Sequence, residues 1–242
     1  TDRGENSRRK MKIYAISDLH LSFSSNKPMD VFGKEWKNHD ARIRENWLQC
    51  VSVNDIVVIP GDISWGLRKD STEEDFRWIH DLPGTKVLFK GNHDFWWTTS
   101  KKLNALYDDM FFIQNTYYAA GDIAICGTRG WDIPESCAEW SAHDEKIYQR
   151  ELRLSLESAK RDGRKRIIAA VHYPPVERRH RRTGFTEILE EFGVEKVIFG
   201  HLHGQTAHRN AFTGISRGIE YRLVFRPVCI AETETTGETE HE

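Results

Sequence analysis

Asp, His and Asn side chains recur in five short motifs spread over most of the chain. The motifs are Asp18-Leu19-His20, Gly61-Asp62, Gly91-Asn92-His93-Asp94, His172 and Gly200-His201-Leu202-His203. A mixture of carboxylate, imidazole and amide oxygen suits manganese, iron or zinc better than calcium or magnesium. Seven side chains are candidate metal ligands, namely Asp18, His20, Asp62, Asn92, His172, His201 and His203. Seven ligands are too many for one tetrahedral ion, but they suit two metal ions that share a carboxylate.

Each of these motifs comes directly after a short apolar segment rich in Val and Ile, which is typical of a buried strand. The segments are Ile13 to Ile16, Ile56 to Ile59, Val87 to Phe89, Ile167 to Val171 and Val197 to Phe199. Ligands of open α/β sheets bind at the carboxyl ends of the strands. We therefore expect one site, built from five segments that are far apart in the sequence.

Helical patterns alternate with these strands. Apolar residues at every fourth position predict a helix over 43–51, and a capping box of Ser71 and Glu74 predicts the start of another. Two more helices are expected at 141–161 and 185–192. Two regions, 110–127 and 219–230, contain successive strands with Gly-containing turns and no helix, so we expect antiparallel pairs there.

Chain length and composition favour a single globular domain. The chain has 242 residues, of which 38% are hydrophobic and 30% charged, and this is ample for one core. We place the domain at residues 11–230. The polar segment 1–10 is expected to form a disordered arm, and the Thr- and Glu-rich segment 231–242 a disordered acidic tail, because neither can bury enough apolar surface.

Charge and hydropathy exclude some partners and indicate a location. The net charge of -2 gives no whole-molecule attraction to nucleic acid or to a membrane. No apolar segment approaches the roughly 20 residues that span a bilayer, and the first ten residues lack a secretion signal, so a cytoplasmic location is expected. The four cysteines form no Cys-x-x-Cys pair, which argues against a zinc ribbon and indicates buried, reduced thiols.

The ordered set of five motifs, spanning residues 18 to 203, resembles that of the calcineurin-like metallophosphoesterase superfamily. The resemblance implies an α/β fold of the α+β type, a four-layer αββα sandwich of two mixed β-sheets flanked by helices. It also implies a ligand assignment. By this analogy Asp18, His20 and His203 hold one metal, Asn92, His172 and His201 hold the other, and Asp62 bridges the two.

The resemblance further implies a binuclear centre of two divalent ions, manganese or iron with zinc as an alternative, and a bridging hydroxide as the nucleophile. His93 adjoins a ligand without belonging to the ligand set, so we interpret it as the general acid that protonates the leaving group. Asp94 is the candidate to orient His93. The protein serine/threonine phosphatases of the superfamily continue Gly-Asp with x-x-Asp-Arg, whereas this chain reads Gly61 to Gly66 without those residues.

That departure disfavours a phosphoprotein substrate, and the His-Tyr-Pro-Pro segment that begins at His172 resembles small-molecule phosphoesterases. We therefore expect hydrolysis of a phosphomonoester or phosphodiester, small or nucleotide-like. A nuclease and a noncatalytic scaffold of the same fold remain alternatives. Within the basic segment 177–182, Arg178 and Arg179 are candidates for substrate binding, with a solvated loop as the alternative. Protein partners remain unknown.

Aromatic residues stand next to two of the metal motifs. Trp65 follows Gly61-Asp62, and Phe95, Trp96 and Trp97 follow Asp94. Such rings can stack on a nucleobase or another ring of a substrate. Packing against the neighbouring helix is the alternative that we favour.

Overall fold

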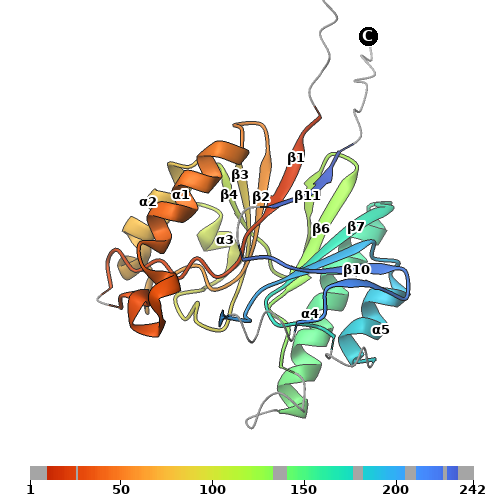
Figure 1. Cartoon of the computed structure of the whole chain (residues 1–242). Coiled ribbons are helices and arrows are strands. Elements are labelled where there is room, and N and C mark those ends of the chain that lie inside the picture. Colours follow the sequence, from red (N-terminus) through yellow and green to blue (C-terminus); the bar gives the residue numbers. More distant parts are fainter. Residues whose placement is uncertain are drawn as a thin grey trace, which may run out of the picture.

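Two mixed β-sheets lie face to face at the centre of the molecule, and helices cover their outer faces (Figure 1). This computed structural model describes residues 10–25, 27–132, 141–176, 182–204, 211–225 and 228–233. The four-layer αββα arrangement expected from the sequence is confirmed. The layer between the sheets is apolar and contains side chains of both, among them Val58 and Phe89 from one sheet and Ile125 and Ile198 from the other.

The first sheet has five strands in the order β11-β1-β2-β3-β4. They are β11 (Val228–Glu232), β1 (Lys12–Ala15), β2 (Ile56–Pro60), β3 (Thr85–Phe89) and β4 (Met110–Phe112). Strands β1 to β4 are parallel, and β11 pairs antiparallel with β1. The carboxyl ends of β1, β2 and β3 therefore lie at one edge of this sheet.

The second sheet has six strands in the order β5-β6-β7-β8-β10-β9. They are β5 (Tyr118–Ala120), β6 (Ile123–Thr128), β7 (Arg166–Val171), β8 (Lys196–Phe199), β10 (Ile219–Leu223) and β9 (Gly214–Ser216). The four central strands are parallel, while β5 and β9 pair antiparallel at the two edges. All five strands that precede a metal motif thus begin and end within two residues of the segments predicted from the sequence.

The two regions that we expected to be antiparallel are only partly so. In the first region β5 and β6 form an antiparallel pair, but β4 pairs in parallel with β3 in the other sheet. In the second region β10 runs parallel to β8, whereas β11 belongs to the first sheet. The chain changes sheets in both regions, and buried Val224 packs in the layer between the sheets. Strands that follow one another without a helix therefore need not pair with each other.

Among the described residues, α-helices and short 3-10 helices connect the strands. They are α1 (His39–Cys50), α2 (Glu73–His80), α3 (Ser100–Leu103), α4 (Ala142–Arg161), α5 (Gly184–Glu191), η1 (Met29–Phe32), η2 (Lys34–Trp36) and η3 (Lys69–Thr72). Helices α1 and α2 cover the first sheet, and α4 and α5 cover the second (Figure 1). Helices α2, α4 and α5 each bury one apolar face, as the spacing of their apolar residues predicts, and α1 buries Trp47.

Helix starts show how well local sequence predicts these elements. Ser141 caps α4, because its hydroxyl accepts a hydrogen bond from Asp144 N at 3.3 Å. The predicted capping box of Ser71 and Glu74 is wrong. Helix α2 begins at Glu73 after the 3-10 turn η3, and the Ser71 hydroxyl instead accepts from the N–H of Arg68.

The boundaries of the domain and the states of the cysteines differ in part from expectation. Strand β11 runs through Glu232, so it includes two residues that we assigned to the tail. Residues 1–9 and 234–242 lie outside the described residues. Of the described cysteines, Cys126 is buried as expected, while Cys50 and Cys229 are exposed. Burial raises the pKa of the Cys126 thiol to about 12, so that thiol stays protonated.

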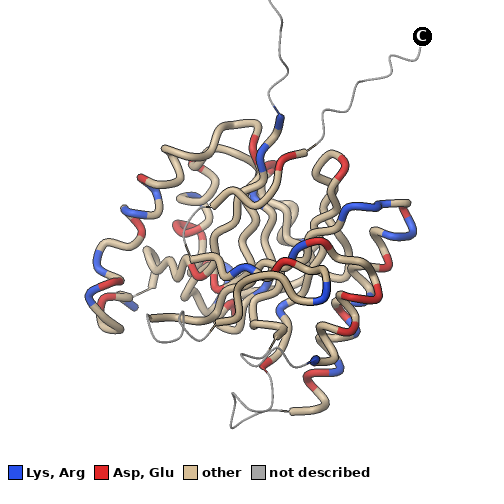
Figure 2. The backbone as a smooth tube through the Cα atoms, turned by 45° about the vertical axis from the view of Figure 1, so that its right-hand side comes forward, with Lys and Arg blue, Asp and Glu red and all other residues tan. Residues whose placement is uncertain are grey.

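Charged residues of both signs are interspersed along the outer helices (Figure 2), in keeping with a net charge near zero. Within the described residues, no helix has the length and apolar character needed to cross a membrane.

A buried lysine ties β3 to the loop before β4. Lys86 is fully buried, and its Nζ donates to the carbonyls of His80 and Leu82 and to Asp109 Oδ2 at 2.6 Å. Burial alone would raise the pKa of Asp109, but the hydrogen bonds from Lys86 and His80 outweigh it and hold that pKa below its usual value. Because the folded state has the lower pKa, ionised Asp109 stabilises the fold above about pH 4, and this contribution is lost as the pH falls through the folded pKa.

We expect Asp109→Asn to lower the free energy of unfolding by about 2 kcal/mol at pH 7, because it leaves the buried ammonium of Lys86 without its carboxylate. Urea unfolding of wild type and variant between pH 7 and pH 3 checks this. The difference should stay constant down to about pH 5 and shrink below about pH 4. A difference that grows with acidity would contradict the assignment.

Candidate metal centre

All seven candidate ligands meet at the carboxyl edge of the two sheets. Asp18 and His20 follow β1, Asp62 follows β2, and Asn92 follows β3. From the second sheet, His172 follows β7, and His201 and His203 follow β8. The side chains form two groups that share Asp62, and within each group the potential ligand atoms of the His and Asp residues lie within 4.8 Å of one another.

The first group consists of Asp18, His20, Asp62 and His203. His20 Nε2 lies 3.6 Å from Asp62 Oδ2 and 3.8 Å from Asp18 Oδ1, and His203 Nε2 lies 3.4 Å from Asp18 Oδ1. The Nε2 atoms of His20 and His203 face each other at 3.1 Å. Two imidazole nitrogens and two carboxylate oxygens thus converge on one small volume, as the ligands of a divalent cation do.

The second group consists of Asp62, His172 and His201, with Asn92 beside them. His172 Nε2 lies 3.4 Å from Asp62 Oδ2 and 2.6 Å from Asn92 Oδ1. His201 Nδ1 lies 3.1 Å from the same Asn92 oxygen. The Nδ1 atom of His172 is hydrogen-bonded to the carbonyl of Pro60 at 3.0 Å, which aims its Nε2 at the group.

Asp62 is the residue that both groups share, and its environment suits a cation. Its side chain is fully buried, and Oδ1 accepts a hydrogen bond from His93 N at 2.9 Å. Oδ2 is buried without any hydrogen-bond partner, as is Nδ1 of His20. A buried carboxylate oxygen without a donor is costly unless a cation binds to it. The residues therefore fit a pair of metal ions that share Asp62.

The pKa values indicate which ligands hold protons when no metal is bound. Burial raises the pKa of Asp18 to about 7. Burial lowers the pKa of His172, but the charge of Asp62 outweighs it and raises that pKa to about 9. Burial, and next the charge of His172, lower the pKa of His201 to about 3. Protons thus compete with a cation mainly at His172 and Asp18, so metal affinity should increase with pH.

The backbone of the ligand loops is strained. Four of the ligand residues, Asp18, His20, Asp62 and His201, have positive φ between 44° and 69°. A left-handed conformation costs roughly 1–2 kcal/mol for a residue with a Cβ atom. Stabilising contacts in the rest of the fold offset this strain. Strained backbone of this kind is common at functional sites.

The glycines of two motifs make room for the carboxylates. A Cβ atom at Gly91 would lie 2.2 Å from Asp62 Oδ1, and one at Gly200 would lie 2.3 Å from Asp18 Oδ2. Any larger residue would displace a candidate ligand. Close packing against the carboxylates therefore explains why glycine occupies these two positions.

Asp94 has partners that differ from those we expected. Its carboxylate accepts hydrogen bonds from four backbone N–H groups and is fully buried. The donors are the N–H groups of Gly91, Asp62, Ile63 and Ser64, at 2.7, 3.0, 2.9 and 3.3 Å. None of these hydrogen bonds reaches His93. The structure thus gives Asp94 the role of joining the loop after β2 to the loop after β3, which positions Asp62 and Asn92.

Aromatic side chains surround the first group. Trp65 stacks on His20 with ring centroids 5.0 Å apart and contacts His93 at 4.4 Å. Trp36 contacts His20 and His203 edge-on at 5.6 and 5.2 Å. Sequence reasoning missed Trp36, because it lies in the 3-10 turn η2, outside every motif.

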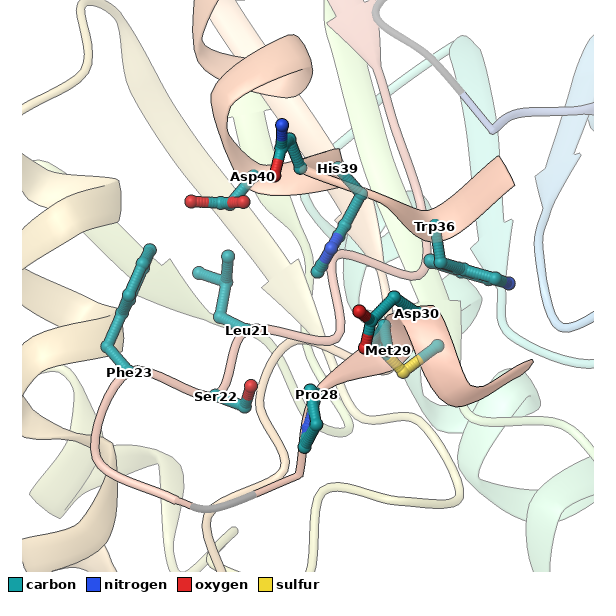
Figure 3. Close-up of a pocket in the computed structure, with 10 residues that line it drawn as sticks. Leu21, Ser22, Phe23, Pro28, Met29, Asp30, Trp36, His39 and Asp40 are labelled. Carbon is teal, nitrogen blue, oxygen red and sulfur yellow. The ribbon is translucent and has the colours of Figure 1, made fainter. Parts of the chain in front are cut away.

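Trp36 also lines a cavity of about 240 Å³ beside this group, together with His39, Met29 and Asp30 (Figure 3). His39 has a structural role there, since its Nε2 is hydrogen-bonded to the carbonyl of Leu19 at 3.0 Å.

The aromatic residues that follow Asp94 differ in burial. Trp96 and Trp97 are buried in the core, as the packing interpretation predicts, whereas Phe95 is 65% exposed. Arg178 and Arg179 lie outside the described residues.

Two curated relatives match a part of this chain. Both are called Gene 66 protein, from Mycobacterium phages L5 and D29, with 37% identity over 78 residues and 32% over 84 residues. The matched segments cover 32% and 34% of this chain. The chain spans 37% and 40% of the length of these relatives.

Solved structures resemble the whole fold. A protein of unknown function from Aquifex aeolicus has a TM-score of 0.51 at 16% identity, covering 90% of this chain and 95% of that one. The phosphopantetheinyl hydrolase of Mycobacterium tuberculosis has a TM-score of 0.52 at 12% identity, covering 90% of each chain. At such identities the likeness shows the fold alone. The family model of calcineurin-like phosphoesterases matches residues 11–205, which contain all five motifs. This chain belongs to the calcineurin-like phosphoesterase family.

Proposed function

We propose that this protein hydrolyses phosphomonoesters or phosphodiesters of small or nucleotide-like molecules with the help of two divalent metal ions. The observation that carries the proposal is the shared carboxylate of Asp62, whose Oδ2 is buried, lacks a hydrogen-bond partner and lies within 3.6 Å of two imidazole nitrogens. Manganese or iron suits the mixed nitrogen and oxygen donors, with zinc as the alternative.

The seven donors divide into a set for each ion. Asp18, His20 and His203 would hold one ion, and His172, His201 and Asn92 the other, with Asp62 between them. When bound, such ions lower the pKa of a water molecule and hold the phosphoryl oxygens for in-line attack.

The charges of this set favour an anionic ester. Only two of the seven donors, Asp18 and Asp62, are carboxylates, so two divalent ions leave an excess of positive charge. The neutral amide of Asn92 takes a place where a third carboxylate would reduce that excess.

The position of His93 supports a role in protonating the leaving group. Its backbone N–H is fixed by Asp62 Oδ1 at 2.9 Å, and its ring lies 5.8 Å from that of His20 and 4.4 Å from that of Trp65. The ring is therefore next to the first group but is not one of its ligands. A general acid in this position matters most for leaving groups that are strongly basic.

We expect His93→Ala to reduce kcat for alkyl phosphate esters about a hundredfold. Its effect on p-nitrophenyl esters should be much smaller, because p-nitrophenolate leaves without a proton. Steady-state kinetics on both kinds of ester check this, with His143→Ala on the exposed surface of α4 as the matched control. Equal losses on the two kinds of ester would argue against a role as general acid.

The aromatic side chains beside His93 favour a substrate whose leaving group contains a ring or another apolar group. Phe32 is 64% exposed and nearly parallel to Trp65, with ring centroids 6.5 Å apart. The ring of Phe95 lies edge-on to that of His93, with ring centroids 6.4 Å apart.

A direct test is hydrolysis of p-nitrophenyl phosphate and bis-p-nitrophenyl phosphate with Mn²⁺, Fe²⁺ or Zn²⁺ added. Hydrolysis that EDTA stops and Mn²⁺ restores supports the proposal. A folded, metal-loaded sample that hydrolyses neither ester would favour the noncatalytic scaffold. The nuclease alternative predicts DNA or RNA binding that weakens steeply with salt.

A further inference from the structure

Arg129 lies at the same edge of the second sheet as the metal ligands, directly after β6. Its carbonyl accepts the N–H groups of His172 and Tyr173 at 3.0 and 3.1 Å, so its backbone is fixed to the strand end that carries His172. The ring of Tyr173 packs on that of His201, with centroids 4.2 Å apart. Arg129 is therefore one aromatic ring away from the second ligand group.

Three aromatic rings hold the guanidinium group of Arg129. Its Cζ lies 5.1 Å from the ring centroids of Trp131 and Tyr148 and 5.6 Å from that of Tyr173. Nη1 donates to the Tyr148 hydroxyl at 2.9 Å. Nε is buried without a hydrogen-bond partner. The aromatic rings orient the cation, but no carboxylate among the described residues forms an ion pair with it, so its charge remains available to an anion.

A small cavity of about 50 Å³ adjoins this cation. Its lining includes Arg129 and Thr128 after β6, Lys90 after β3, and Glu151 of α4. Lys90 directly precedes the motif that contains Asn92. Glu151 already accepts a hydrogen bond from Thr128 Oγ1 at 3.0 Å. Two cations against one carboxylate leave the cavity positive.

We propose that Arg129 and Lys90 form an anion subsite beside the metal centre, which binds a second negatively charged group of the substrate. The group is a phosphate or carboxylate several bonds away from the phosphorus that is attacked. The inference rests on the proposed hydrolysis, because it assigns that reaction a substrate with two anionic groups. Arginine held in one orientation binds such groups well, since its N–H donors match two oxygens at once.

A pair of esters with the same leaving group tests the subsite in the metal-loaded enzyme. Thymidine 5′-(p-nitrophenyl phosphate) has one anionic group, and its 3′-phosphorylated counterpart has two. We expect kcat/KM of wild type to be about tenfold higher for the second ester. Arg129→Gln and, separately, Lys90→Gln should remove most of this preference. Arg153→Gln is the matched control, because Arg153 likewise lies over an aromatic ring, that of Phe192, but on the outer surface, where it forms an ion pair with Glu191.

A binding measurement separates this inference from the proposed hydrolysis. Inorganic phosphate is titrated calorimetrically into the full chain after EDTA has removed metal ions. We expect wild type and Arg153→Gln to bind phosphate, and both Arg129→Gln and Lys90→Gln to bind it about tenfold more weakly. Equal phosphate affinity in all four proteins, or no binding by wild type, would overturn the subsite. Phosphate binding without hydrolysis of either ester would retain the subsite and overturn the proposed function.

Discussion

Asp62→Asn should reduce kcat/KM for phosphoesters about a thousandfold. The variant should also lose at least one bound metal ion per chain. The substitution keeps the shape of the side chain and removes its charge. Both ligand groups contain Asp62 Oδ2, at 3.6 Å from His20 Nε2 and 3.4 Å from His172 Nε2. An amide that replaces this oxygen offers one neutral acceptor at most, so the two cations would repel each other with less negative charge between them.

The measurement is kcat/KM for bis-p-nitrophenyl phosphate with saturating Mn²⁺, together with the melting temperature of each protein. Asp70→Asn serves as the control, because Asp70 is exposed on η3. A variant Asp62→Asn that keeps more than about a tenth of wild-type activity would contradict a bridging role.

Asp94→Ala should have the largest effect on stability, and we expect it to lower the free energy of unfolding by about 3–5 kcal/mol. The substitution leaves four buried backbone N–H groups, on two loops, without an acceptor. Such a loss is a large part of the total stability of a domain, which is about 5–15 kcal/mol.

Urea unfolding at pH 7 measures this effect, and Asp94→Asn is the informative companion. The single carbonyl oxygen of the asparagine side chain can accept hydrogen bonds from only some of the four donors. The stability of this variant should therefore lie between that of the Asp94→Ala variant and that of wild type. If Asp94→Ala instead left stability unchanged and impaired only alkyl esters, Asp94 would orient His93 as the sequence first led us to expect. That outcome would reverse our interpretation of the hydrogen bonds.

The strands, the order of the motifs and the convergence of the seven donors could be predicted from the sequence. Short apolar segments fit buried strands, and parallel pairing brings Asp18 and Asp62 to one edge of the first sheet and His172 and His201 to one edge of the second. Helices α1, α4 and α5 were predictable for the same reason, since one apolar face recurs with the helical period.

Other features depend on contacts between distant segments. Strand β4 pairs with β3 and β11 pairs with β1, and the order of strands in the sequence does not predict these pairings. The positive φ of Asp18 and His201 is maintained by the surrounding loops. The contacts of Trp36 and of the three aromatic rings around Arg129 join segments that are distant in the sequence, and no local spacing predicts them.

The number of metal ions that each chain binds tests the central claim most directly. Protein saturated with Mn²⁺ and freed of excess metal can be analysed by elemental analysis, with Asp62→Asn prepared in parallel. The shared carboxylate predicts about two ions per chain for wild type and one or fewer for the variant. One ion or none in wild type, or two ions in both proteins, would contradict a binuclear centre bridged by Asp62.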